Sequence, residues 1–248
     1  MTNGAGGVLR ILRFLAAQPH PLPASRIAAT VGLPRSTVYR LLATLRAEGF
    51  VVHLADDRAW GLGVTAYEVG SGYTRQAPLQ RLARQSMARL VDTVGESAHL
   101  AVLYGRDVVY VIEERATGRP SLVTDVGVRL PAHLTASGRA MLAALPPAQV
   151  RALFPDRSAF VHRADAGPAT PSALRAVLAE TRQRGHARED GEITPGFASV
   201  AAAVLDHNGH PVASVAVTYP GDTLVDPDDL ARPVISTAAA LSRRLGAP

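Results

Sequence analysis

Residues 33–50 read "LPRSTVYRLLATLRAEGF", and their spacing predicts one short amphipathic helix. Apolar side chains recur at i, i+3, i+4 and i+7, which is the period of a buried helical stripe, at Val38, Leu41, Leu42 and Leu45. The opposite side is polar and basic: Arg35, Ser36, Thr37, Tyr39, Arg40 and Thr44. Pro34 is suited to the first turn of this helix, and Gly49 is suited to the position where the helix ends. By itself the pattern is equally typical of any helix with one solvated face. The flanking segments are needed to tell which kind of helix it is.

The segments around this helix predict a winged helix-turn-helix. A first helix is expected over 7–17, and "QPHPLP" then interrupts the chain. A short helix over 24–31 and Gly32 lead into the quoted helix, as in a helix-turn-helix pair. After it, "FVVHL" and "AWGLG" flank a polar turn at residues 56–58, the pattern of a hairpin wing. We therefore assign residues 1–63 to a DNA-binding domain.

The remainder of the chain predicts an α+β domain with a mainly antiparallel sheet. Residues 64–95 are expected to form linker helices, with an interruption at Pro78. The hairpin "AHLAVLY"–"VVYVIEE" and a second one turning at Asn208-Gly209 supply strands. Helices are expected over about 136–144, 147–153, 171–185 and 226–245. We assign residues 96–248 to this second domain.

Composition restricts the classes of function that the chain can have. The 248 residues contain no cysteine, which excludes disulfides, thiolate metal sites and a cysteine nucleophile. Neither a signal peptide nor an apolar run of membrane-spanning length is evident, so a cytoplasmic protein without a membrane partner is expected. Up to Arg75 there are 8 arginines against 4 acidic residues, whereas the rest has 18 against 17. This concentration of positive charge favours a polyanion partner for the N-terminal part.

Signatures of catalysis are poor in this sequence. The nucleophile elbow, the phosphate loop and the H-E-x-x-H zinc motif do not occur. His207 and His210 flank a turn and have no third ligand nearby, so they are not expected to bind a metal. Glu113 and Glu114 are adjacent on a strand and therefore face opposite sides of it, which is wrong for an acid–base pair. We expect no catalytic residue, metal or cofactor.

The quoted helix has the residues that read DNA in a major groove. The second helix of a helix-turn-helix lies in the groove, and its N-terminal residues contact base edges. Ser36, Arg40 and Thr44 share one face, with Thr37 beside them. Arg40 is the natural bidentate donor to a guanine, and Ser36 and Thr37 can reach a phosphate or a base.

Three further residues of this domain are candidates at its edges. Arg35 at the helix start is expected to contact the DNA backbone. Tyr39 can either contact DNA or pack on a neighbouring helix. Arg58 at the tip of the wing can contact a flanking phosphate or the minor groove, or it can be a solvated loop arginine.

The sequence resembles transcriptional regulators of the IclR family nearly from end to end. The resemblance lies in "GLPRSTVYRLLATLRAEGFV", "GESAHLAVLYGRDVVYV", "LTASGRAMLAALP" and "RGHAREDGEITPGFASVAAAVLDHNGHPVASVAV", in this order. It implies a winged helix joined by a linker helix to a GAF-like effector domain. It also implies a dimer or a dimer of dimers whose affinity for DNA is altered by a small molecule, commonly an organic acid.

The resemblance also implies where the effector binds. In such proteins the loop before the "ASGRA" helix binds an anion through backbone N–H groups, and an acidic residue after the "RG" turn accepts a hydrogen bond from the ligand. Carried over to this chain, the effector residues are Ala136, Ser137, Gly138, Glu189, Phe197, Ser199, Ala216 and Thr218. Ala216 stands where the family often has serine, and Phe197 adds bulk. These departures disfavour a very small hydroxy acid and favour a ligand with an apolar or aromatic part.

The sequence therefore predicts a regulator that binds double-stranded DNA at an inverted-repeat operator, as a dimer or tetramer, and senses a small organic acid. Two alternatives stay open at this point. The second domain can be an enzyme, because a sensor pocket and an active site look alike in sequence. The winged helix can instead be a protein–protein module, although its exposed arginines argue against this.

Overall fold

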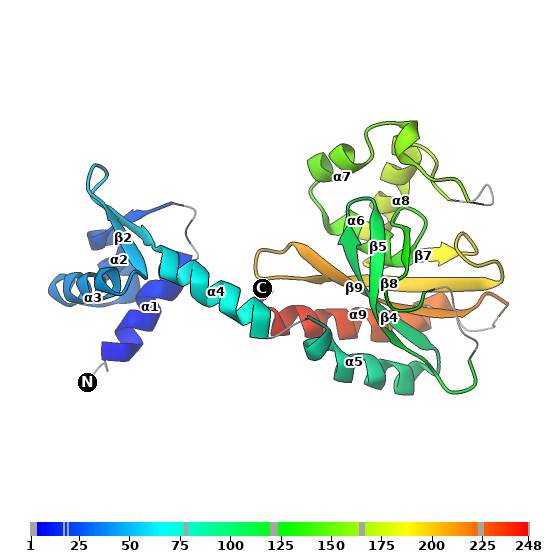
Figure 1. Ribbon diagram of the computed structural model, residues 1–248, viewed down its shortest axis with the longest axis horizontal. Helices are drawn as coiled ribbons and strands as arrows, with labels where there is room; N and C mark the ends of the chain where they lie inside the picture. Colours follow the sequence, from blue (N-terminus) through cyan, green and yellow to red (C-terminus); the bar gives the residue numbers. More distant parts are fainter. Residues whose placement is uncertain are drawn as a thin grey trace. The chain divides into compact units, whose positions relative to one another are not determined.

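The computed structural model describes residues 4–16, 18, 20–76, 79–119, 124–163, 167–222 and 226–247. The chain forms two compact units, Met1–Pro78 and Leu79–Pro248 (Figure 1). The predicted end of the first helix at Ala17 lies outside the described residues.

The first unit is a winged helix, as predicted. Its helices are α1 (Gly4–Ala16), α2 (Ala24–Val31), α3 (Arg35–Ala47) and α4 (Val64–Gln76). Gly32 adopts a left-handed φ of 67° between α2 and α3, which makes the tight turn possible. The wing is the antiparallel pair β2 (Val51–Leu54) and β3 (Ala59–Leu62). The predicted apolar stripe of α3 is buried in one core with residues of α1, α2 and the wing, among them Ile11, Ile27 and Trp60.

One strand of this unit was not predicted. Leu22 and Pro23 form β1, which pairs with Ala59 and Trp60 of β3 and completes a three-stranded sheet. The prolines that break the helical pattern do not prevent this pairing because β1 lies at the edge of the sheet, where a missing N–H is tolerated.

The second unit is built on one antiparallel sheet of six strands in the order β6-β5-β4-β9-β8-β7. The strands are β4 (Ser97–Tyr104), β5 (Asp107–Glu114), β6 (Arg129–Pro131), β7 (Ala187–Asp190), β8 (Phe197–Leu205) and β9 (Pro211–Pro220). The register aligns His99, Ala216 and Ala201 across β4, β9 and β8. Because side chains alternate along a strand, these three residues lie on the same face of the sheet.

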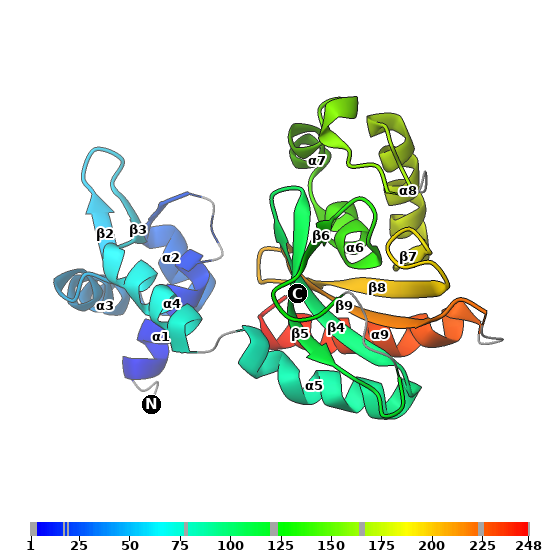
Figure 2. The same ribbon diagram turned by 45° about the vertical axis from the view of Figure 1, so that its right-hand side comes forward.

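Helices cover both faces of this sheet (Figures 1 and 2). One face packs against α5 (Leu79–Val94) and α9 (Pro227–Arg244) in an apolar core that includes Met87, Val215 and Val234. The other face carries α6 (Ala136–Ala144), with α7 (Pro147–Leu153), α8 (Pro171–Arg184) and a 3₁₀ helix at Arg157–Ala159. The apolar cluster between α6 and the strands beneath it consists of small side chains: Ala136, Ala140, Ala187, Ala201 and Ala216. This close packing places the N-terminus of α6 directly over the sheet.

The segment expected to be linker helices, residues 64–95, is divided between the two units. α4 contacts β2 of the first unit. α5 buries Ala83 and Met87 fully in the core of the second unit. α5 is therefore a structural part of the sheet domain.

Candidate DNA-binding surface and effector pocket

The polar face of α3 is available to a partner. Arg35, Ser36, Arg40 and Thr44 are exposed, and Thr37 is half-buried. Tyr39, for which the sequence left a packed position open, has 55% of its surface exposed. The six polar residues predicted on α3 thus lie on the part of its surface that the buried stripe leaves free. Arg35 and Ser36 are in the first turn.

Arg58 lies in the exposed turn that joins the two wing strands, as predicted. Its φ of 48° is left-handed, and its backbone N–H donates to the Ala55 carbonyl at 3.2 Å. The turn therefore presents the arginine side chain at the end of the wing.

The second unit contains a narrow cavity of about 20 Å³ between the start of α6 and the sheet. The structure brings together seven of the eight predicted effector residues in its wall: Ala136, Ser137, Glu189, Phe197, Ser199, Ala216 and Thr218. The wall also contains six residues that the sequence analysis missed: His99, Tyr110, Thr124, Thr135, Ile193 and Thr194. Most of the missed residues are polar, so the cavity is more polar than the sequence suggested.

Gly138 does not line this cavity. Its N–H donates to the side chain of Thr135, the N-cap of α6, at 3.0 Å. A Cβ on Gly138 would lie 2.2 Å from the Ala132 carbonyl oxygen, so only glycine allows the helix to lie this close to the preceding backbone. Gly138 therefore positions α6, and Ala136 and Ser137 are the residues of its first turn that line the cavity.

Ser137 has an unusual position for a hydroxyl group. It is 1% exposed, and among the described residues its Oγ makes no hydrogen bond of good geometry, although the Tyr110 hydroxyl lies near it. Thr135 already caps the helix, so capping does not explain Ser137. Leaving a buried hydroxyl unsatisfied costs about 1–3 kcal/mol.

The Tyr110 side chain lies beside Ser137 and is also buried. Burial raises the pKa of Tyr110 strongly, and the nearby Ser137 hydroxyl opposes the rise only in part. Tyr110 is therefore a neutral phenol that can donate a hydrogen bond.

Glu189 is the acidic group of the cavity. Burial raises its pKa to about 7, while the Ile193 N–H, which donates to Oε1 at 3.0 Å, opposes the rise. The charge of Glu192 raises this pKa further, and Ser199 and Arg139 lower it. Near neutral pH the carboxyl group is therefore protonated about half of the time and can donate to, as well as accept from, a ligand.

Other polar groups of the wall lie close to one another, although the buried His99 Nδ1 has no partner among the described residues. The hydroxyls of Ser199 and Thr218 lie 3.0 Å apart on neighbouring strands. His99 Nε2 lies 2.8 Å from Thr124 Oγ1, and burial lowers the pKa of His99 to about 4, assisted by Arg115. His99 is thus neutral at physiological pH, and none of the described residues in the cavity wall has a cationic side chain. An anion must be held there by backbone N–H groups and neutral donors.

The other candidates from the sequence do not form a second site. His207 and His210 lie beside an exposed turn, and no group of three metal-ligating side chains occurs among the described residues. Glu113 pairs with Arg115 at 3.1 Å. In the described part of the chain, no helix is both long and apolar enough to cross a membrane.

Comparison with known proteins assigns the chain to a family. Residues 71–243 match the family model described as "Bacterial transcriptional regulator IclR C-terminal", and residues 8–55 match the IclR helix-turn-helix domain. The chain belongs to the IclR family. It is therefore a DNA-binding transcriptional regulator, and its relatives are named regulators and repressors rather than enzymes.

Individual relatives are similar to this chain over most of their length. The "Glycerol operon regulatory protein" of Streptomyces coelicolor is 33% identical, covering 96% of this chain and 94% of its own. The "Transcriptional repressor IclR" of Escherichia coli is 29% identical, and the match covers 88% of this chain and 80% of the repressor. An IclR homologue from Microbacterium hydrocarbonoxydans, solved in complex with 4-hydroxybenzoate, has the same fold, with a TM-score of 0.61, 24% identity and coverage of 98% and 99%.

Proposed function

We propose that this IclR-family regulator acts in the cytoplasm and binds an inverted-repeat operator as a dimer or a dimer of dimers. Residues 1–63 bind DNA, 64–95 connect the domains and 96–248 bind the effector. The exposed basic and hydroxyl side chains in the first turns of α3 support groove binding, with Arg40 reading a base. Because each chain has one such helix, two-fold symmetry requires two self-complementary half-sites.

Selection from random double-stranded DNA tests this proposal. We expect palindromic sequences whose half-sites lie roughly 10–10.5 bp, or a multiple of this, apart. Recovery of an asymmetric site bound by a monomer would contradict the dimer. Failure to enrich any sequence would favour the protein–protein module.

We further propose that the effector is a small organic acid with an apolar or aromatic part. The observation that carries this is the buried hydroxyl of Ser137, which lacks a partner among the described residues at the N-terminus of α6. A helix N-terminus favours a negative group, and the neutral donors beside it suit a carboxylate. The 4-hydroxybenzoate complex of the homologue has this chemistry.

A thermal-shift screen over aliphatic and aromatic carboxylic acids, repeated on Ser137→Ala, tests the pocket. Since Thr135 caps α6, the variant should keep or slightly raise its stability without ligand. The best acid should bind about ten- to a hundredfold more weakly, because a hydrogen bond to a charged group is lost. Ser214→Ala is the matched control, since Ser214 Oγ is equally buried and unpartnered among the described residues but lies outside the cavity wall. An unchanged affinity in Ser137→Ala would remove this hydroxyl from the site.

A further inference from the structure

The cavity is too small for the ligand proposed above, and this inference rests on that proposal. A volume of about 20 Å³ holds about one water molecule, whereas an organic acid with an apolar part needs several times more. Part of the wall must therefore move before an effector can enter.

The parts of the wall differ in how firmly they are held. The strands that carry Tyr110, Ser199 and Ala216 are paired on both sides within the sheet. The start of α6 is pressed against the backbone of Ala132. The loop Gly191–Gly196, which contributes Ile193 and Thr194, is half-buried or exposed along its whole length.

Glycines stand at both ends of this loop. Its first and last residues, Gly191 and Gly196, have left-handed φ values of 75° and 81°. Glycine at both ends lets the chain change direction at little steric cost. Backbone hydrogen bonds close the base of the loop, from the Gly191 N–H to the Phe197 carbonyl at 2.9 Å and from the Gly221 N–H to the Gly196 carbonyl at 2.8 Å. Within the loop, the Glu192 side chain forms an ion pair with Arg139 of α6.

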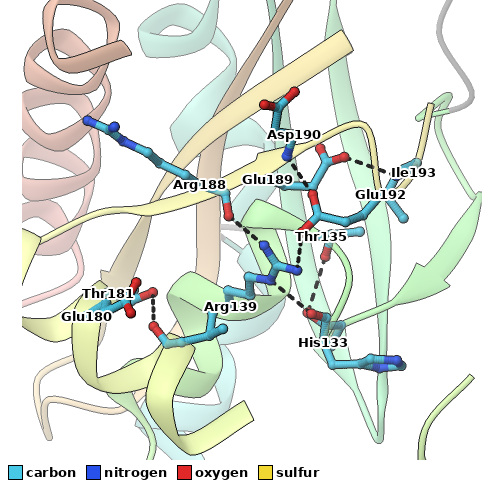
Figure 3. Close-up of polar contacts among 12 residues, drawn as sticks. His133, Thr135, Arg139, Glu180, Thr181, Arg188, Glu189, Asp190, Glu192 and Ile193 are labelled. Atoms are coloured by element: carbon cyan, nitrogen blue, oxygen red, sulfur yellow. Dashed lines mark hydrogen bonds and ion pairs between the residues drawn. The ribbon is translucent and has the colours of Figure 1, made fainter. Parts of the chain in front are cut away.

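Arg139 is the fixed partner of that contact (Figure 3). Its side chain is 5% exposed, and it donates to two backbone carbonyls, His133 at 2.9 Å and Arg188 at 2.8 Å. Its third contact is the ion pair with Glu192, at 2.7 Å. Because two of the three contacts are with ordered backbone, Arg139 stays in place when the loop moves.

Two further hydrogen bonds connect the loop to the cavity. The second oxygen of Glu192 accepts from the N–H of Asp190, and Glu189 accepts from the N–H of Ile193. Glu189 is thus both a wall residue of the cavity and an anchor of the loop. A ligand that takes the Glu189 carboxyl group as its partner competes with the bond to Ile193.

We propose that residues 191–196 are a lid over the effector cavity and that the Arg139–Glu192 ion pair is its latch. Breaking a buried ion pair leaves an uncompensated charge, so this contact sets how often the lid opens. Arg139 and Glu192 act as positioning residues, because they control entry without touching the ligand.

A single thiol placed inside the cavity measures lid opening without any effector. The chain has no cysteine, so Ser199→Cys introduces one reactive group on the cavity wall. Its rate of alkylation by iodoacetamide reports how often a small reagent reaches the cavity. Because no acid ligand is used, the lid can fail this test while the effector proposal stands, and the reverse also holds.

Two changes at Glu192 are compared in the Ser199→Cys background. Glu192→Asp keeps the charge but shortens the side chain, and Glu192→Gln keeps the shape but removes the charge. Both should raise the alkylation rate about tenfold or more, as expected for weakening a charge-assisted hydrogen bond. Since Glu192→Asp preserves the local charge, its effect is not a change in the pKa of the thiol. Glu180→Gln is the control, because it removes the exposed pair with Arg184 on α8, and the rate should not change.

Hydrogen exchange separates a latch from a general stabilising contact. In the Glu192 variants, faster exchange confined to the amides of residues 190–197 supports the latch. Exchange that accelerates equally in β4, β9 and α8 would overturn it, as would alkylation rates that match those of the Ser199→Cys parent. An equal acceleration by Glu180→Gln would overturn it as well.

Discussion

Arg40→Ala should weaken binding to the selected operator by about 1–3 kcal/mol and relax the preference at one base of each half-site. The expected loss is large because a bidentate arginine–guanine contact carries both affinity and sequence information. Arg40 is exposed one turn after the start of α3, where the helix can enter the groove. Binding titrations and a repeated selection on the variant measure both effects.

Two other arginines of α3 separate base reading from charge. Arg35→Ala should weaken all DNA sequences alike and reduce the salt slope by about one counterion, because Arg35 is placed to contact phosphate. Arg46→Ala removes the same charge from the last turn of α3 and should leave the selected sequence unchanged. If Arg40→Ala behaves like Arg46→Ala, α3 does not read DNA through Arg40.

Glu189→Gln should abolish a pH dependence that the wild-type protein shows. With a pKa of about 7 in the folded state against 4.5 for an ordinary glutamate, Glu189 binds its proton more tightly when folded. Its contribution to stability is therefore full below pH 4.5, falls as pH rises and is lost above about pH 7, in total about 3 kcal/mol. Denaturant titrations between pH 4.5 and 8 measure the difference between wild type and variant.

The same proton should control the effector. Above pH 7 the ionised Glu189 repels a carboxylate, so the affinity for the best acid of the screen should fall about tenfold per pH unit. In Glu189→Gln the affinity should be flat over this range. Glu180→Gln, on the exposed side of α8, should retain the wild-type pH profile of both stability and affinity. A wild-type profile in Glu189→Gln would show that Glu189 does not titrate near neutral pH.

Much of the fold followed from periodicity and breakers in the sequence. The helices 24–31, 136–144 and 147–153 have the predicted bounds. β1, β6 and β7 were missed because strands of two to four residues give little alternating pattern; the wing strands are as short, but the polar turn between them marked a hairpin. All three lie at sheet edges, where pairing with a neighbour defines the strand more than its own residues do.

The cavity was predictable only in part, and its residues show why. Ser137 and Glu189 stand in motifs of the family, so the resemblance located them. His99 and Tyr110 lie on strands that the sequence predicted, but their place in the wall depends on register, which pairs His99 with Ala216 and Tyr110 with Ala101. No local pattern specifies that long-range register. Arg139 and Glu192 likewise meet only because α6 and the loop after β7 converge.

The order of strands in the sheet has a consequence for synthesis of the protein. β4 lies between β5, its neighbour along the chain, and β9, which follows only after the helices α6, α7 and α8 and the three strands β6, β7 and β8. Pairing between segments so distant is slow, because the intervening chain must be ordered first. The core of the winged helix consists of residues of the first unit, which can fold as soon as that unit leaves the ribosome. A chain interrupted before Pro211 would thus contain the complete winged helix but lack the cavity wall at Ala216 and Thr218, so under the proposed function the effector response is the last property that the nascent protein acquires.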